Sequence, residues 1–137
     1  MPKKKFSPNK LSRQFLTENA GALRVRRETE VPVPAFGDDM TVNVRGLSVA
    51  DKNLLALLQQ EGRDAMSVIA ALCAVDDDGA LVFGESKLTA VDFVETLPEH
   101  FRMDIAAIST AALRLSGRPV APVDDVEETA VEDAEKN

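Results

Sequence analysis

Residues 74–85, with the sequence Ala-Val-Asp-Asp-Asp-Gly-Ala-Leu-Val-Phe-Gly-Glu, decide the fold that the sequence predicts for this chain. Helical periodicity runs into this segment from one side and resumes on the other. Aspartates tolerate irregular backbone and Gly79 permits a positive φ, so residues 76–79 have the chemistry of a turn. Residues 81–83, Leu-Val-Phe, then form a short apolar run. We therefore expect two helical segments, joined by a turn and by a short extended piece that packs on both.

The composition is that of one small domain with an aliphatic core. The chain has 137 residues, of which 45% are hydrophobic, with six phenylalanines and no tryptophan or tyrosine. This length is enough for one core and short for two. Cys73 is the one cysteine, which excludes an intramolecular disulfide, and its apolar sequence neighbours predict a buried thiol. No apolar run approaches the ~20 residues of a membrane span, so we expect a soluble, intracellular protein without membrane contact.

Charge is unevenly distributed along the chain, whose formal net charge is -7. The first 27 residues carry eight basic side chains and one acidic one, Glu18. Residues 118–137 carry seven acidic side chains and two basic ones, with few large apolar groups to offset the entropy of ordering. We predict a basic flexible arm over residues 1–21, a globular domain over residues 22–117 and an acidic disordered tail over residues 118–137.

The basic arm is expected to hold little structure. Leu11, Phe15 and Leu16 fit a single turn of amphipathic helix. Pro8 before this turn, and Asn19 and Gly21 after it, confine any helix that forms there.

Alternating patterns predict a β-hairpin in front of the main helices. Over residues 22–35, apolar and polar residues alternate with the period of a half-buried strand. Pro32 and Pro34 cannot donate to a strand ladder, which places this strand at a sheet edge. Residues 36–39 form a turn, and residues 40–45 alternate again as a second strand. Because an isolated hairpin is marginal in water, its apolar face must lie on the helices that follow.

The first two of four helical segments follow the hairpin directly. Ser48 and Asp51 have the spacing of a capping box, which marks a helix start, and Gly62 ends that helix. A second helix is predicted over about residues 63–75. The apolar side chains that share the inner faces of these helices are Leu54, Leu55, Leu57, Leu58, Met66, Ile69, Ala70 and Cys73.

The other two helices lie on the far side of the central turn. The third begins at Glu85 or Ser86, and Pro98 opens a long last helix that ends at residues 116–119. The side chains spaced to face inward from these two helices are Leu88, Val91, Val94, Phe101, Ile105, Ile108, Ala112 and Leu115. The sequence thus predicts an α+β fold, in which an N-terminal β-hairpin packs on a small bundle of about four helices between disordered termini.

The acidic turn permits a calcium interpretation and a structural one. In an EF-hand loop, Asp76 and Asp78 would hold the third and fifth positions and Glu85 the twelfth. Ala74 would then hold the first position, where calcium coordination depends on a charged ligand. The sequence therefore favours a plain acidic turn.

The sequence predicts a non-catalytic protein that acts by binding, with no cofactor and no metal. His100 is the one histidine and has no second histidine or cysteine at ligand spacing, which favours a surface position. The chain contains no Gly-x-Ser-x-Gly motif, no phosphate-cradling loop and no nucleophile beside a base.

Several motifs, taken in their order along the chain, resemble those of one protein family. They are Val42-Asn-Val-Arg-Gly-Leu-Ser48, Leu72-Cys-Ala-Val-Asp-Asp-Asp-Gly-Ala-Leu-Val-Phe83, Leu97-Pro98 and Ala111-Ala-Leu-Arg-Leu-Ser-Gly117. Over residues 25–117 the chain resembles the tail assembly chaperones of long-tailed bacteriophages and prophages. The resemblance implies a non-catalytic chaperone that binds and solubilises the tape-measure protein and helps recruit tail-tube subunits. It also implies a place in the host cytoplasm and absence from the mature virion.

The helical faces supply a candidate surface for such a client. A groove between short helices can bury the apolar stripe of a helical partner, and leucine and methionine side chains adapt to many stripes. The candidate client-binding residues are Leu54, Leu57, Leu58, Met66, Ile69, Ile105 and Ile108. For each of them the alternative is a place in the core, which the sequence favours for any one residue.

Two other functions stay open on the sequence. The basic arm, with Lys3 to Lys5 and Arg24 to Arg27, fits a small nucleic-acid-associated regulator, although no nucleic-acid-binding signature accompanies it and nucleic acid is the less favoured partner. A virion structural protein of the head–tail connector or tail would instead form a fixed ring. Self-association is compatible with each of these functions.

Overall fold

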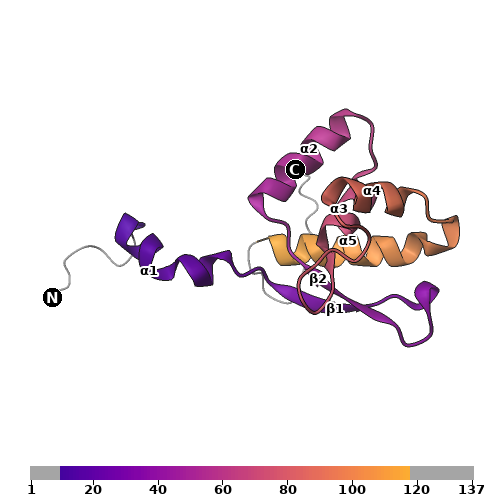
Figure 1. Cartoon of the computed structure of the whole chain (residues 1–137), viewed down its shortest axis with the longest axis horizontal. Helices are drawn as coiled ribbons and strands as arrows, with labels where there is room; N and C mark the ends of the chain where they lie inside the picture. The colour runs from indigo at the N-terminus through magenta and orange to yellow at the C-terminus, as the bar shows by residue number, and fades with distance from the viewer. Residues whose placement is uncertain (1–9, 118–137) are drawn as a thin grey trace, which may run out of the picture.

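A three-stranded antiparallel sheet and the helices packed around it form the body of the molecule (Figure 1). The computed structural model describes residues 10–117, so the predicted acidic tail and the first nine residues of the basic arm lie outside the described residues. In chain order the elements are α1 (Arg13–Arg24), β1 (Glu28–Pro32), η2 (Pro34–Phe36), β2 (Thr41–Arg45), α2 (Val49–Gln60), α3 (Ala65–Cys73), β3 (Ala74–Val75), α4 (Lys87–Glu95), η3 (Glu99–Phe101) and α5 (Arg102–Ser116). This order confirms the α+β class, with a hairpin followed by packed helices.

The predicted hairpin is confirmed. β1 and β2 pair antiparallel, with Glu28 opposite Arg45 at one end and Pro32 opposite Thr41 at the other. β3 pairs with the other side of β2, so the strand order is β1-β2-β3 and β1 lies at an edge. An edge strand tolerates Pro32 because its missing amide does not interrupt a ladder.

The third strand is a correction to the predicted second helix. The sequence places residues 63–75 in one helix, whereas α3 ends at Cys73 and Ala74 turns to extended backbone, with φ -79° and ψ 119°. Val75 then bridges Leu81 after the turn. The free side of β2 offers unpaired backbone groups, and satisfying them outweighs one further turn of helix.

The central turn is confirmed as the sequence predicts it. The Asp76 carboxylate accepts hydrogen bonds from the amides of Asp78 and Ala80, at 2.8 and 3.0 Å. Gly79 has a φ of +83°, which is the left-handed conformation that glycine adopts without strain. The carboxylate of Asp76 is therefore engaged with the backbone of its own turn.

The core surrounds α3, which lies against α4, α5 and α2 (Figure 1). Every residue of α3 from Val68 to Cys73 is buried, so this part of the helix is covered on all sides. A helix that is apolar all round belongs in the middle of a domain. The predicted burial of Cys73 is confirmed.

The N-terminal part of the chain differs from the prediction. α1 is a twelve-residue helix, whose first turn is capped by the Ser12 hydroxyl accepting from the amide of Phe15 at 3.1 Å. The strand predicted over residues 22–35 is wrong at both ends, since it begins only at Glu28 and gives way to η2 after Pro32. The alternation around Leu23 marks no buried face, because that side chain is exposed.

In α4, one residue that the sequence predicts to face inward lies at the surface. Val91 and Val94 are buried as predicted, but Leu88 is exposed and Ala90 takes the inner position. The backbone of Gly84 passes so close to Ala90 that a Cβ on Gly84 would lie 2.5 Å from the Ala90 nitrogen. Only small residues fit this contact, which brings α4 against the chain that leaves the central turn.

One buried carboxylate joins three separate segments. Asp51 is fully buried and completes the predicted capping box at the start of α2 with Ser48. Its Oδ2 lies 2.9 Å from Arg26 Nη1 in the linker between α1 and β1, and its Oδ1 lies 2.8 Å from Lys87 Nζ at the start of α4. Burial by itself raises the pKa of Asp51, but hydrogen bonds from Lys87 and from the Ser48 backbone, with the charge of Arg26, outweigh it and lower the pKa below its ordinary value.

A second buried carboxylate fixes the hairpin tip on α5. Asp104 accepts a hydrogen bond from the amide of Ala35 at 2.7 Å. Beside this contact the rings of Phe36 and Phe101 lie 4.6 Å apart between centroids. Together they hold η2 against η3 and the start of α5.

We predict that Asp51→Asn lowers the free energy of unfolding at neutral pH by about 2–3 kcal/mol, because it leaves two cations without their buried partner. The pKa of Asp51 is lowered in the folded chain, so its contribution is present above the ordinary value of 3.8 and is lost as the pH falls through the folded value. Urea unfolding followed by circular dichroism at neutral and acidic pH measures both effects. The variant should show a shallower acid loss than the parent, and exposed Asp38→Asn serves as the control; equal acid slopes for parent and Asp51→Asn would contradict this role.

We predict that Gly84→Ala lowers the free energy of unfolding by about 1–3 kcal/mol, because the new methyl group meets the backbone of Ala90. Gly21→Ala in α1 is the matched control, since a Cβ there meets nothing within 4 Å. Removing a helix-interior glycine should stabilise α1 by about 0.5–1 kcal/mol. Thermal unfolding and helical content separate the two variants, and unchanged stability of Gly84→Ala would rule out the close contact.

Candidate functional site

Four of the seven predicted client-binding residues belong to the core. Leu58, Ile69, Ile105 and Ile108 are each exposed by 6% or less. Their helices face one another, with α3 packed between α4 and α5, so the apolar stripes that look like a docking surface in the sequence cover each other. These four residues are therefore corrected from client-binding to core positions.

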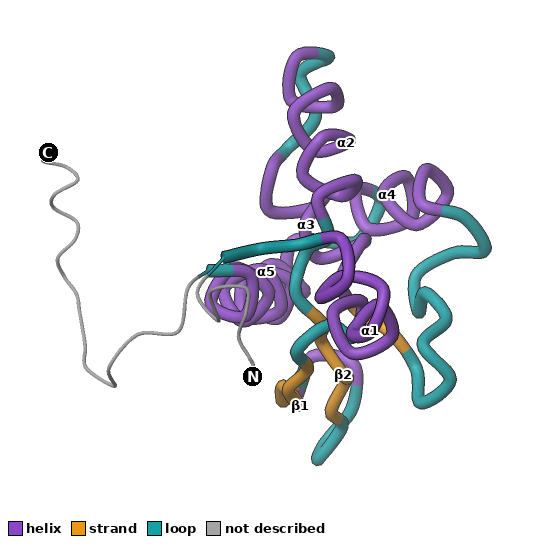
Figure 2. Tube along the Cα trace, turned by 90° about the vertical axis from the view of Figure 1, so that its left-hand side faces the viewer, coloured by secondary structure: helices purple, strands orange, loops and turns teal. Residues whose placement is uncertain are grey.

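The other three predicted residues lie nearer the surface. Leu54 is half-buried against the core, whereas Leu57 is 58% exposed and Met66 is 38% exposed. α2 extends away from the body at the top of Figure 2, which presents the outer side of this helix to solvent. Leu57 is the one predicted residue with most of its side chain available to a partner.

α1 exposes large apolar side chains along one face. No residue of α1 is buried, and the helix stands to the left of the body in Figure 1. The large apolar side chains exposed on this helix and directly before it are Leu11, Phe15, Leu16 and Leu23. A helix of twelve residues is only marginally stable in water unless its apolar face packs on another surface. We therefore expect a partner to pack on this face of α1.

The sequence predicts only a single helical turn in this segment, whereas α1 has twelve residues and a local signal for the whole helix exists. Ser12 stands at the N-cap, and Phe15, Leu16, Asn19 and Leu23 recur at one face of a helix. Asn19 also supports the helix, because its side-chain amide donates to the Phe15 carbonyl at 2.8 Å. The low helix propensity of Gly21 and Asn19, and the strand-like alternation that follows them, oppose this signal.

The charges of the chain separate α1 from the body. The first 27 residues carry a net charge of +7, from eight basic side chains and one acidic one. Residues 28–117 carry six basic and fifteen acidic side chains, a net charge of -9. A partner that covers the apolar face of α1 therefore meets a basic residue at each end of the helix, Arg13 and Arg24.

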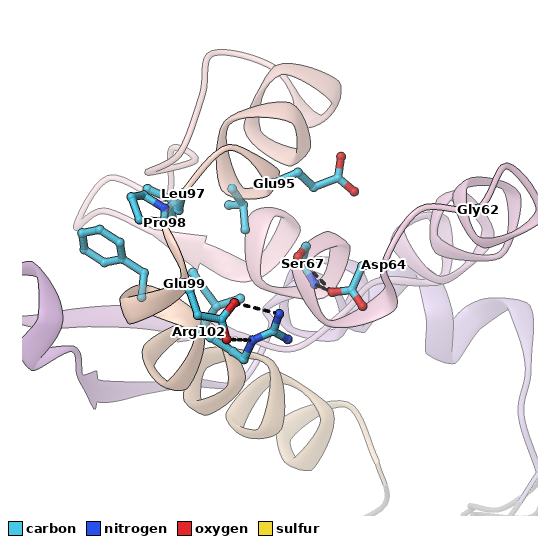
Figure 3. A pocket seen from close by; sticks show the side chains of 11 residues that line it. Gly62, Asp64, Ser67, Glu95, Leu97, Pro98, Glu99 and Arg102 are labelled. Atoms are coloured by element: carbon cyan, nitrogen blue, oxygen red, sulfur yellow. Dashed lines mark hydrogen bonds and ion pairs between the residues drawn. The ribbon is translucent and has the colours of Figure 1, made fainter.

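A hollow of about 420 Å³ opens between the start of α3, the end of α4 and the start of α5 (Figure 3). Its charged side chains make hydrogen bonds and ion pairs with nearby residues. Asp64 caps α3 by accepting from the amide of Ser67 at 3.0 Å, and Arg102 makes a two-point ion pair with Glu99 at 2.6 and 3.1 Å. The hydrogen bonds and charge of Arg102 lower the pKa of Glu99. Glu95 is paired with Arg63 at 2.7 Å, so the carboxylates around this hollow stabilise helix ends.

Cys73 and His100 occupy different environments. Burial, followed by the negative charge of Asp51, raises the pKa of the Cys73 thiol to about 12. His100 is exposed, with its ring 4.3 Å from that of Phe101 between centroids. Within residues 10–117 no group of three or more histidine, cysteine, aspartate or glutamate side chains lies close enough to hold a metal ion. No helix in the same stretch of chain is both long enough and apolar enough to cross a membrane.

Comparison with known proteins finds no match to this chain. No protein-family model matches the chain, and neither a curated protein nor a solved structure does. The candidate functional surface consists of the exposed apolar face of α1, with Leu57 on α2 as a second exposed position.

We predict that Cys73 of the folded protein does not react with iodoacetamide at pH 8 and reacts once the chain is unfolded in urea. The raised pKa keeps the Cys73 thiol neutral in the folded chain. Burial of this neutral thiol therefore contributes to stability in full below pH 9.0, and the contribution is lost as the pH rises toward about 12. The stability of the parent should therefore fall more steeply over this range than that of Cys73→Ala, by up to about 1.4 kcal/mol per pH unit. Labelling measured by mass spectrometry and urea unfolding test both statements, and rapid labelling of the folded chain would contradict them.

Proposed function

We propose that this protein is a non-catalytic phage tail assembly chaperone, which binds and solubilises the tape-measure protein and helps recruit tail-tube subunits. The order of its sequence motifs supports the family, and the observation that carries the binding role is the uncovered apolar face of α1. In this proposal α1 is the primary client contact and Leu57 on α2 is a second one. The protein acts in the host cytoplasm and leaves before the virion is complete.

The chemistry of α1 defines the client that fits it. A helix of twelve residues is about 18 Å long, and α1 presents an apolar stripe with a basic residue at each end of the helix. The matching surface is the apolar stripe of another helix, flanked by acidic residues, as in helix-in-groove or coiled-coil packing. A long helical tape-measure protein offers many such stripes in succession.

The size of the face suits binding that is later reversed. Burying one large apolar side chain contributes about 1.5–3 kcal/mol, and α1 and its N-terminal flank offer four. The loss of translational and rotational freedom on association, together with ordering of side chains, offsets a large part of this gain. One chaperone therefore binds one client segment weakly, and many copies along a long client together keep it soluble.

The basic arm favours one alternative function, a nucleic-acid-associated regulator. The charge of +7 over the first 27 residues is compatible with phosphate contacts. Such binding loses affinity steeply as salt rises, whereas contacts through Phe15 and Leu23 are apolar and persist. A virion structural protein would differ again, because it would be a single fixed oligomer in solution.

We predict that Phe15→Asp and Leu23→Asp each reduce recovery of the co-expressed tape-measure protein by at least about tenfold, because a carboxylate at the apolar stripe must be desolvated on binding. Leu57→Asp should reduce recovery less, as expected of a second contact. Pull-down and the soluble fraction of the client measure these effects, with thermal unfolding to confirm that each variant folds.

Met103→Asp is the matched control, since this side chain is 83% exposed and lies on α5, away from both contacts. Client recovery unchanged in Phe15→Asp and Leu23→Asp would remove α1 from the binding surface. Failure of the unaltered protein to recover the client, combined with salt-sensitive DNA binding, would replace the chaperone function by the regulator.

A further inference from the structure

We propose that residues 118–137 of the same chain dock on the apolar face of α1 and cover it when no client is bound. The proposal concerns one surface, formed by Phe15, Leu16 and Leu23, and one occupant, the acidic segment that follows α5. Its regulatory consequence rests on the proposed function, while the docking itself does not.

The point at which the described chain ends places this segment beside α1. Arg27, three residues after α1, donates through Nη1 to the Gly117 carbonyl at 3.0 Å. The Leu47 amide donates to the Ser116 hydroxyl at 2.7 Å, which fixes the end of α5 at the same place. A hollow of about 570 Å³ there is lined by Leu23 and neighbouring residues on one side and by the end of α5 on the other. The acidic segment therefore starts at the base of α1.

The acidic segment carries an apolar pattern that matches α1 in period and length. Its apolar residues recur at helical spacing, and they are Val123, Val126, Ala130, Val131 and Ala134. Pro122 directly precedes this stretch and Asp124 and Asp125 fall in its first turn, as at many helix starts. From Val123 to Ala134 the stretch has the length of α1, about 18 Å as a helix.

Charge favours α1 over the rest of the molecule as the docking place. Residues 118–137 carry seven acidic and two basic side chains, a net charge of -5. Residues 10–27, which include α1, carry five basic side chains and one acidic one, a net charge of +4. Residues 28–117 carry -9, so the body repels the segment and the α1 region attracts it.

The connection is long enough and sets the direction of docking. Residues 118–122 span at most about 18 Å when extended, which lets the segment turn back along α1 from its base. Since α1 runs from its free end at Arg13 to the base at Arg24, the docked segment runs antiparallel to it. Val126 then lies near Leu23, and the small Ala134 lies near the bulky Phe15.

Docking would make the segment a competitor of the client. An apolar stripe flanked by acidic residues is the same surface that the proposed function requires of a tape-measure helix. A chaperone without client would keep its apolar face covered, and a client with stronger apolar contacts would displace the segment.

The test is hydrogen exchange of the full chain without any client, at low salt and at two protein concentrations. In the parent, amides of residues 16–23 should be protected. Val126→Asn combined with Val131→Asn should raise their exchange rates by about tenfold or more, because an uncovered α1 frays. Thr129→Asn, on the opposite side of the apolar pattern, is the matched control and should leave the rates unchanged.

Two results would overturn the proposal. Equal exchange of α1 in the parent and in the double variant would show that the segment does not cover it. Protection that rises with protein concentration, together with slower diffusion, would identify a second copy of the chain as the occupant. Because no client is present, failure of the chaperone function leaves this readout intact, and the pull-down tests that function separately.

Discussion

The buried carboxylate of Asp51 is the interaction on which the arrangement of the chain depends. It caps α2, pairs with Arg26 before β1 and pairs with Lys87 at the start of α4. A buried charge without partners is costly, so these three segments stay together or separate together. The same contact sets the direction in which α2 leaves the body and anchors the linker that carries α1.

Around this junction the chain divides its apolar residues between a closed core and exposed edges. α3 is covered on all sides from Val68 to Cys73, and the inner stripes of α4 and α5 help to cover it. The surfaces left for a partner therefore lie at the periphery, on α1 and on the outer side of α2. A partner that binds at such edges would leave the core undisturbed.

Local signals were sufficient for most of the fold. The hairpin, its edge proline, the capping box of Ser48 and Asp51 and the acidic turn each depend on neighbouring residues, and the structure confirms them. α1 was also encoded locally, by the Ser12 cap and the spacing of Phe15 and Leu23. It was predicted only as a single turn, because Gly21 has a low helix propensity. The two-residue strand β3 was not predicted, because it depends on the free side of β2.

By itself, the sequence determined the fold class, the starts of α2 and α4 and the separation of charge along the chain, since propensity, capping and charge are properties of short segments. The last helix, predicted to open at Pro98, begins instead as the short helix η3 and continues as α5 from Arg102. Only the tertiary structure decided which apolar stripes are core and which are surface. Leu57 and Leu58 are adjacent in sequence and equally apolar, yet one is exposed and the other is buried. The difference arises because burial depends on what packs against each face of a helix, and periodicity specifies a face without specifying its partner.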